Sequence, residues 1–347
     1  MAHSVNVADV VDASKIGSFQ IRCFILCALV ALLDGFDAQA IAFVASALAS
    51  KFNVPIAAFG PIFGAGTIGL ALGALILPPF ADRFGRKYQI VLATALFGVF
   101  SLATVWVDSF GMLALLRFLT GIGVGAAVPN LIPLTAEYAP KRMRALLITI
   151  VTSSWPMGAV LGGLVSSKMI PVYGWQSVFY LGGILPLVLV AILVPLLPES
   201  IRFLVNRSAN PELIAGILRR IASGQTYSAQ STFTLPEENL TGFSVKHLLS
   251  GRRVAVTLLL WVSFFMNFLV LFFSFNWLPP LMQQAGQPIE RAIIAVVAFN
   301  LGGIIGGVVM GRLMDKLGHF FVVGLAYAFG AVFVGAIGLV GFGLPLL

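Results

Sequence analysis

Apolar runs of about 20 residues recur along this chain, each bounded by charged residues or by Pro and Gly. A helix of that length is what crosses the hydrocarbon core of a bilayer. The runs cover approximately residues 20–48, 59–80, 88–107, 110–133, 145–169, 176–196, 254–282, 289–311 and 320–343. They predict an all-α polytopic membrane protein with about nine spanning helices.

The composition of the chain also indicates that its apolar helices are embedded in a lipid bilayer. Hydrophobic residues make up 59% of the chain and charged residues only 10%, and the mean hydropathy is +1.01. A soluble domain cannot bury so much apolar surface. The net charge of +8 does not indicate nucleic-acid binding, because the basic residues form short clusters between the apolar runs.

Those basic clusters predict the orientation of the chain. Most of them fall in the amino-terminal tail and in every second loop: Lys15, Arg22, Arg83, Arg86, Lys87, Lys141, Arg142, Arg144, Arg202, Arg207, Arg219, Arg220, Lys246, Arg252, Arg253, Arg312 and Lys316. Only Lys51, Lys168 and Arg291 fall in the opposite set of loops. Because cytoplasmic loops carry the excess of Lys and Arg, we expect the amino terminus and the long central loop in the cytoplasm.

The chain divides into three parts. We expect an N-terminal six-helix bundle over 1–200, a polar cytoplasmic linker over 201–252, and an incomplete C-terminal bundle of about three helices over 253–347. Within the linker, PELIAGILRRIA predicts a short amphipathic helix along the membrane face. The second bundle repeats the first: DRFGRK at 82–87 returns as DKLGHF at 315–320, 233 residues later, and the same offset aligns Asp34 with Asn267.

Several motifs resemble the major facilitator superfamily. ADRFGRK is similar to its loop signature between helices two and three, GRLMDKLGH to the weaker copy between helices eight and nine, and PESIRFL to the end of the first bundle. ALLDGFDAQAIAFVASALA resembles the first helix of the aromatic acid:proton symporters, which bring benzoate-type carboxylates into bacteria. The resemblance implies a major facilitator-type two-bundle fold with about nine of twelve helices present. The missing helices suggest a truncated chain or a partial gene model.

Two aspartates lie inside the first apolar run, where a carboxylate is costly. Asp34 and Asp37 are three residues apart, so they project from one face of a helix. Arg117 in the fourth run falls at a similar depth. A carboxyl group whose proton affinity changes with helix arrangement meets the physical requirement for proton coupling, so both aspartates are candidates for it. The alternative is a buried ion pair that only fixes the first helix against the fourth.

The predicted substrate site centres on Arg117, whose planar fork can bind a carboxylate. Asp34 and its repeat counterpart Asn267 are further candidates, and Phe36 or Trp155 could flank the ring. Ordinary packing is the alternative for both aromatic residues.

The predicted gate lies in the loop that contains Asp82, Arg83, Gly85 and Arg86, and in its copy at Asp315. Asp82 could meet a basic group or a helix N-terminus in one conformational state only. Glu137 could add a lock with the basic cluster at 141–144, which ends at Arg144, or lie in a solvated loop. His319 is a candidate proton relay, although a surface histidine is more often a bystander.

The sequence therefore predicts a proton-coupled importer of an aromatic carboxylate of the benzoate or hydroxybenzoate type, in the inner membrane. We expect a monomer that needs no cofactor or metal and is not an enzyme, since no Walker motif, catalytic triad or metal-ligand spacing occurs. One alternative is a proton symporter of sugars or other organic anions, suggested by PESIRFL. An alternative of another class is a truncated inactive remnant or a membrane sensor.

Overall fold

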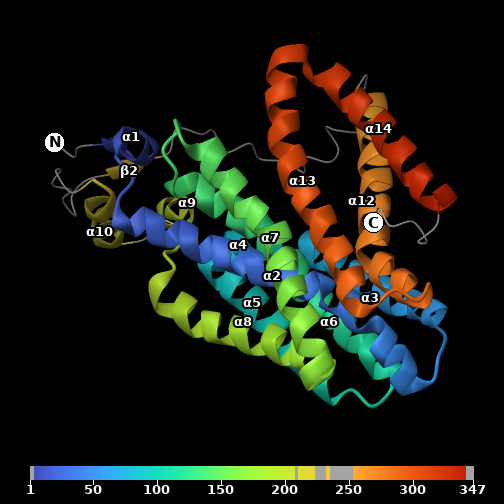
Figure 1. Cartoon of the computed structure of the whole chain (residues 1–347). Helices are drawn as coiled ribbons and strands as arrows, with labels where there is room; N and C mark the ends of the chain where they lie inside the picture. The colour runs from blue at the N-terminus through green and yellow to red at the C-terminus, as the bar shows by residue number, and fades with distance from the viewer. Residues whose placement is uncertain (1–3, 208–209, 223–231, 235–252, 341–347) are drawn as a thin grey trace.

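The computed structural model describes residues 4–207, 210–222, 232–234 and 253–340. Six long helices precede the linker: α2 (Ser18–Phe52), α3 (Gly60–Ile76), α5 (Arg86–Ala103), α6 (Phe110–Tyr138), α7 (Arg144–Tyr173) and α8 (Gln176–Leu196). Three follow it: α12 (Arg253–Gln284), α13 (Ile289–Leu317) and α14 (His319–Val340) (Figure 1). Within the described residues, eight helices have the length and apolarity to cross a membrane, and a shorter apolar helix covers Phe320–Ala336. Each predicted run therefore coincides with a helix.

Short elements complete the chain. They are β1 (Ser4–Asn6), α1 (Val7–Ala13), the 3₁₀ turns η1 (Ile56–Phe59) and η2 (Thr104–Trp106), α4 (Pro78–Phe84), α9 (Ile201–Asn206), α10 (Pro211–Ile221) and β2 (Thr232–Thr234). The second predicted span, 59–80, lies within the membrane-length run Ile56–Ala81, which consists of η1, α3 and the first part of α4. Proline lacks the N–H that a continuing helix needs, so Pro78 and Pro79 start the separate helix α4.

The predicted amphipathic helix in the linker is present as α10, with a different partner. Its buried side chains Ile214, Leu218 and Ile221 belong to a core cluster with Val7 and Val11 of α1. Beside them, β1 pairs in parallel with β2, with Val5 opposite Phe233. The apolar face of α10 therefore packs on protein rather than along the membrane face.

In the first bundle, α3 and α6 touch through their backbones. A Cβ added at Gly69 or Gly73 of α3 would overlap the carbonyl oxygens of Phe118 or Ile122 of α6. In the same way, a Cβ at Gly125 of α6 would overlap the carbonyl oxygen of Leu70. Small residues allow this close approach, which is how helices associate where lipid removes the hydrophobic driving force.

We expect Gly69→Ala to destabilise the protein by roughly 1–3 kcal/mol, because the added methyl group must push α3 away from α6. The melting temperature of the purified protein measures this effect. Gly64→Ala on the same helix is the matched control, since a Cβ there meets nothing within 4 Å. Equal melting temperatures for the two variants would contradict the close packing of α3 on α6.

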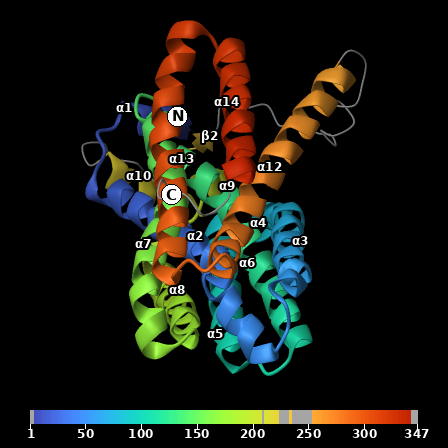
Figure 2. The same ribbon diagram turned by 45° about the vertical axis from the view of Figure 1, so that its right-hand side comes forward.

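The three later helices approach the first bundle at one end only. Ile293 and Val297 of α13 pack in a core cluster with Phe43 of α2, and α12 places Trp277 against Phe63 of α3, with ring centroids 5.2 Å apart. Toward its start, α12 diverges from the first bundle (Figure 2) and exposes long apolar side chains such as Leu259. The two sets of helices are therefore closed together at the end far from α1 and separated at the end near it.

Candidate functional site

Asp37 lies at the centre of the first bundle and is 2% exposed. The hydroxyl of Ser101 on α5 donates a hydrogen bond to its Oδ1. Its Oδ2 is 3.8 Å from Nη1 of Arg117 on α6. That separation is an ion pair but too long for a direct hydrogen bond. Sequence reasoning expected this aspartate beside Arg117, and the structure brings the two together.

Arg117 is held from three sides. Its Nη2 donates to the hydroxyl of Thr104 at 2.6 Å, and its guanidinium carbon lies 4.9 Å from the centroid of the Phe179 ring on α8. With Asp37 on the third side, the planar fork is fixed in one orientation. Its Nε has no hydrogen-bond partner among the described residues. The arrangement leaves a positioned, buried N–H donor, and a carboxylate is the natural acceptor for it.

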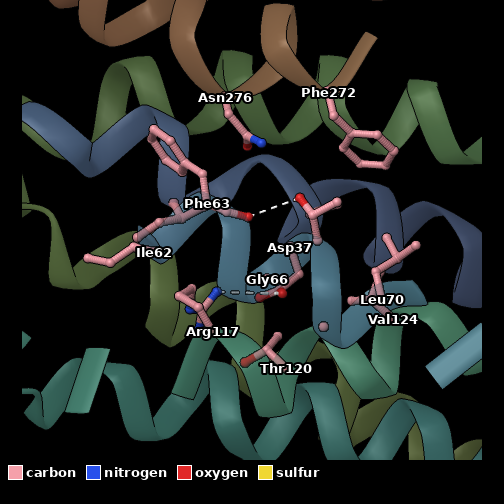
Figure 3. A pocket seen from close by; sticks show the side chains of 14 residues that line it. Asp37, Ile62, Phe63, Gly66, Leu70, Arg117, Thr120, Val124, Phe272 and Asn276 are labelled. Atoms are coloured by element: carbon pink, nitrogen blue, oxygen red, sulfur yellow. Dashed lines mark hydrogen bonds and ion pairs between the residues drawn. The ribbon is translucent and has the colours of Figure 1, made fainter. Parts of the chain in front are cut away.

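Beside this pair is a cavity of about 50 Å³, which we call the small chamber. Figure 3 shows Asp37 and Arg117 on one side of it, with Asn276 and Phe272 of α12 opposite. The residues that line the chamber are Asp37, Ala38, Ile41, Ile62, Phe63, Gly66, Thr67, Leu70, Arg117, Thr120, Gly121, Val124, Phe272 and Asn276. An aromatic ring needs a cavity of about 150 Å³, so the small chamber has room for a carboxylate but not for a ring.

Asp34 faces a second cavity, of about 420 Å³, which we call the large chamber. Its lining is apolar and aromatic apart from Asp34 and Thr152: Ala31, Leu70, Ala74, Val124, Gly125, Val128, Pro129, Leu131, Ile132, Val151, Trp155, Phe268, Leu271 and Phe272. Asp34 is 0% exposed. Neither of its carboxyl oxygens has a hydrogen-bond partner among the described residues. Two aspartates one helical turn apart thus have opposite environments, one paired and one unpaired.

The two chambers are neighbours, because Leu70, Val124 and Phe272 line both. Trp155 also faces the large chamber, as its candidate role required, and its ring lies 5.7 Å from that of Phe275. Phe36 does not reach either chamber: it is 3% exposed, and a Cβ added at Gly162 of α7 would overlap its ring. Its surroundings are those of a packing residue.

The structure does not bring Asn267 to this site. Asn267 lies in a separate groove with Met310 and Tyr327, formed by α12, α13 and α14. The polar residue that α12 contributes to the small chamber is Asn276, which the sequence reasoning missed. The available signal was an amide inside an apolar run, which is a reason to suspect function.

Two further polar residues that the sequence analysis did not single out lie at the end of the site away from α1. Gln39 of α2 and Asn300 of α13 exchange buried hydrogen bonds of 3.4 and 3.5 Å. The two residues are 261 positions apart in the sequence, so their hydrogen bonds join the first bundle to the later helices. Together with Trp277 on Phe63, they close the space between the two sets of helices on the side away from α1.

The charged cluster at the end near α1 differs from its prediction. Glu137 forms an ion pair with Arg86 of the loop signature and accepts a 2.6 Å hydrogen bond from Ser200. Arg144 pairs instead with Asp12 of α1, at 3.2 Å. The prediction that Glu137 pairs with the basic cluster at 141–144 was therefore wrong, because its ion-pair partner is Arg86. Glu137 ends α6 facing α5, whereas Arg144 starts α7 beyond a turn and faces the amino-terminal tail.

The remaining gate candidates cluster around the same loop. Gly85 has φ +98°, a backbone conformation that favours glycine, and a Cβ there would overlap the carboxylate of Glu199. That carboxylate accepts a 3.1 Å hydrogen bond from the backbone N–H of Lys87. The carbonyl of Arg83 accepts from Arg207 at 2.7 Å. The side chains of Asp82, Asp315 and His319 lie outside the described part of the structure.

We expect Arg86→Ala to lower stability by about 1–3 kcal/mol, because it removes the ion-pair partner of Glu137, whose side chain is 4% exposed, and leaves it only the weaker attraction of Arg202. Adding Glu137→Gln should restore most of the loss, since the double variant buries no unpaired charge. Melting temperatures of the purified proteins test both statements. Arg83→Ala is the control, because that side chain is exposed. A double variant as unstable as Arg86→Ala would contradict the ion pair.

Comparison with known proteins identifies the family of this chain. Residues 27–347 match the family model described as Major Facilitator Superfamily. The chain belongs to the major facilitator superfamily. It is therefore a multi-pass membrane transporter and not an enzyme, and the expectations on family and fold class are confirmed.

Several similar proteins are named as transporters of aromatic acids. The 4-hydroxybenzoate transporter PcaK of Pseudomonas aeruginosa is 40% identical over 338 residues, which are 96% of this chain and 75% of that protein. The gallate transporter of Pseudomonas putida is 41% identical over 335 residues, 96% of this chain and 74% of its own length. The benzoate transport protein of Acinetobacter baylyi is 31% identical over 346 residues, 98% and 73% of the two chains.

Among solved structures, the xylose transporter XylE from E. coli in a partially occluded inward open conformation matches with a TM-score of 0.67. The identity is 22%, over 87% of this chain and 74% of that one. This likeness confirms the all-helical major facilitator fold.

Proposed function

We propose that this chain is a secondary transporter that takes up an aromatic carboxylate together with protons. The observation that carries the proposal is the buried guanidinium of Arg117, which Asp37, Thr104 and Phe179 fix in the wall of the small chamber. A buried, preorganised arginine is suited to bind a carboxylate. The names of the relatives, which include transporters of 4-hydroxybenzoate, gallate and benzoate, support the same substrate class.

The surroundings of the site favour a ring over a sugar. The large chamber offers Trp155, Phe268 and Phe272 and few polar groups, whereas a sugar requires many hydrogen-bonding partners. The sugar-porter alternative rests on PESIRFL and on the fold that this chain shares with a xylose transporter, and a fold alone does not specify a substrate.

Proton coupling is assigned to the two aspartates in different ways. Asp34 has no counter-ion and no hydrogen-bond partner among the described residues, so a proton is the available species that neutralises it. Asp37 is already paired with Arg117. A substrate carboxylate that binds Arg117 competes with Asp37 for the same cation, which links substrate binding to the charge on the aspartates.

Uptake of radiolabelled 4-hydroxybenzoate into proteoliposomes with an acidic exterior tests the function. We expect accumulation that collapses with a protonophore and is inhibited by excess benzoate but not by excess xylose. Inhibition by sugars and not by benzoates would favour the sugar porter. The absence of any transport would favour the inactive remnant or sensor. Protein-free vesicles control for passive entry of the uncharged acid.

We further propose that the amino terminus is cytoplasmic and that the large chamber faces the cytoplasm. Arg83 and Asp108 are exposed residues at opposite ends of the first bundle, and the native Cys23 and Cys27 are fully buried. A membrane-impermeant maleimide added to intact cells should label Asp108→Cys and leave Arg83→Cys unlabelled. Labelling of Arg83→Cys and not of Asp108→Cys would show the opposite orientation, with the amino terminus outside the cell.

A further inference from the structure

Gln39 and Asn300 form a polar contact within an apolar interface between the first bundle and the later helices. Their side chains are 1% and 2% exposed, and each amide donates to the other and accepts from it, at 3.4 and 3.5 Å. The same two helices also meet through apolar side chains, since Phe43 of α2 packs in one cluster with Ile293 and Val297 of α13. We call Gln39 and Asn300 the amide pair. It joins two sets of helices that must part and rejoin in a transporter that works by alternating access.

The amide pair lies at the inner end of this closed region. A cavity of about 970 Å³ lies between α7, α12, α13 and α14, and its lining on α13 begins at Phe299 and Asn300 and extends to Gly307. One turn earlier on α13, Val296 and Val297 are only 1% and 6% exposed. Asn300 therefore has the cavity on one side and buried packing on the other, which is where a closure between the two sets of helices begins.

A buried amide pair makes such a closure reversible. The net gain from a buried hydrogen bond is small, because both groups bond to water again when the helices part. Apolar side chains of similar shape in the same places would hold the interface closed at least as well. One amide left buried without the other is costly, so the pair favours closure only when both side chains meet. The closed arrangement is thus specified in register without being made permanent.

We propose that the amide pair sets the balance between the closed and the open arrangement on the side away from α1, and that it separates and re-forms in each transport cycle. The proposal goes beyond the proposed function, because it requires two sets of helices that move and no particular substrate. Gln39 and Asn300 line neither the small chamber nor the large chamber. They are therefore positioning residues that act on the helices.

The reactivity of a cysteine in the interface tests the proposal in purified protein in nanodiscs. The reporter is Val297→Cys, at a position that is 6% exposed, and wild-type protein gives the maleimide background of the buried Cys23 and Cys27. We expect Gln39→Leu to raise the labelling rate of the reporter about tenfold, because closure then buries the amide of Asn300 without its partner. The double variant Gln39→Leu with Asn300→Leu should label no faster than the reporter alone, since an apolar pair restores closure.

The matched control is Gln20→Leu on the same helix. Gln20 is also a buried amide, but it donates at 2.8 Å to the carbonyl of Tyr138 within the first bundle, so labelling should not change. Gln39→Asn, which is too short to reach Asn300, is a milder variant for which we expect a change in the same direction if Gln39→Leu does not fold. Unchanged labelling in the folded single variants, or a double variant that labels as fast as Gln39→Leu, would overturn the proposal. Equally fast labelling in Gln20→Leu would also overturn it, because a general loosening of the protein would then explain the effect.

Discussion

Arg117→Ala is expected to abolish uptake of aromatic carboxylates while the protein still reaches the membrane. The guanidinium is the cation of the small chamber, and truncating one partner of a buried, hydrogen-bonded charge pair at a binding site costs about 2–5 kcal/mol of binding free energy. Because 1.4 kcal/mol corresponds to a factor of ten, uptake in proteoliposomes at low substrate concentration should fall about 30-fold or more. Arg117→Lys keeps the charge but not the planar fork, so it should recover only part of the rate.

The control for this prediction separates substrate binding from structural damage. Arg117→Ala also leaves Asp37 without its counter-ion, and that alone could disturb the first bundle. The double variant Arg117→Ala with Asp37→Asn removes both charges. If Arg117 binds substrate, the double variant regains stability and still fails to bind 4-hydroxybenzoate in a direct binding measurement, which does not depend on proton coupling by Asp37. Binding restored in the double variant would assign Arg117 a structural role, as the ion-pair alternative holds.

Asp34→Asn is expected to eliminate accumulation while preserving exchange of substrate across the membrane. A gradient of one pH unit supplies about 1.4 kcal/mol per proton, enough for about tenfold accumulation with one coupled proton. Asparagine cannot carry that proton, so the concentration ratio should fall to about one. Counterflow of labelled for unlabelled substrate needs no coupling and should persist.

Asp37→Asn is the matched comparison, because it lies one turn away and is paired. It releases Arg117 from its acidic partner and should change substrate affinity as well as coupling. An Asp34→Asn protein that still accumulates substrate tenfold would exclude Asp34 as the coupling residue.

The sequence predicted the positions of the helices better than it predicted which side chains meet between them. Span lengths and the charges within them stand out against apolar runs, so nine helices and the neighbourhood of Asp37 and Arg117 could be found without a structure. Partner choice depends on the rotation of each helix, which the pattern does not determine. Glu137 had several cations within reach at one end of the bundle, and only the facing of α6 toward α5 selects Arg86.

The case of Asn267 has a simple geometric cause. The gapless repeat aligned it with Asp34, but the amide that reaches the small chamber is Asn276, nine residues later on α12. Nine residues correspond to about 900° of helical rotation, which is half a turn away from alignment. The repeat therefore identified the correct helix and the wrong face of it.

The backbone contact between α3 and α6 also decides which parts of the transporter can move. Leu70 and Val124 lie on these two helices, and glycines hold them at a fixed distance, so that side of the substrate passage behaves as a rigid plate. Widening or narrowing of the small chamber must then come from its other walls, α2 through Asp37 and α12 through Phe272 and Asn276. We therefore expect α3 and α6 to move as one body during transport, so that substitutions along α12 change turnover while the spacing of these two helices stays constant.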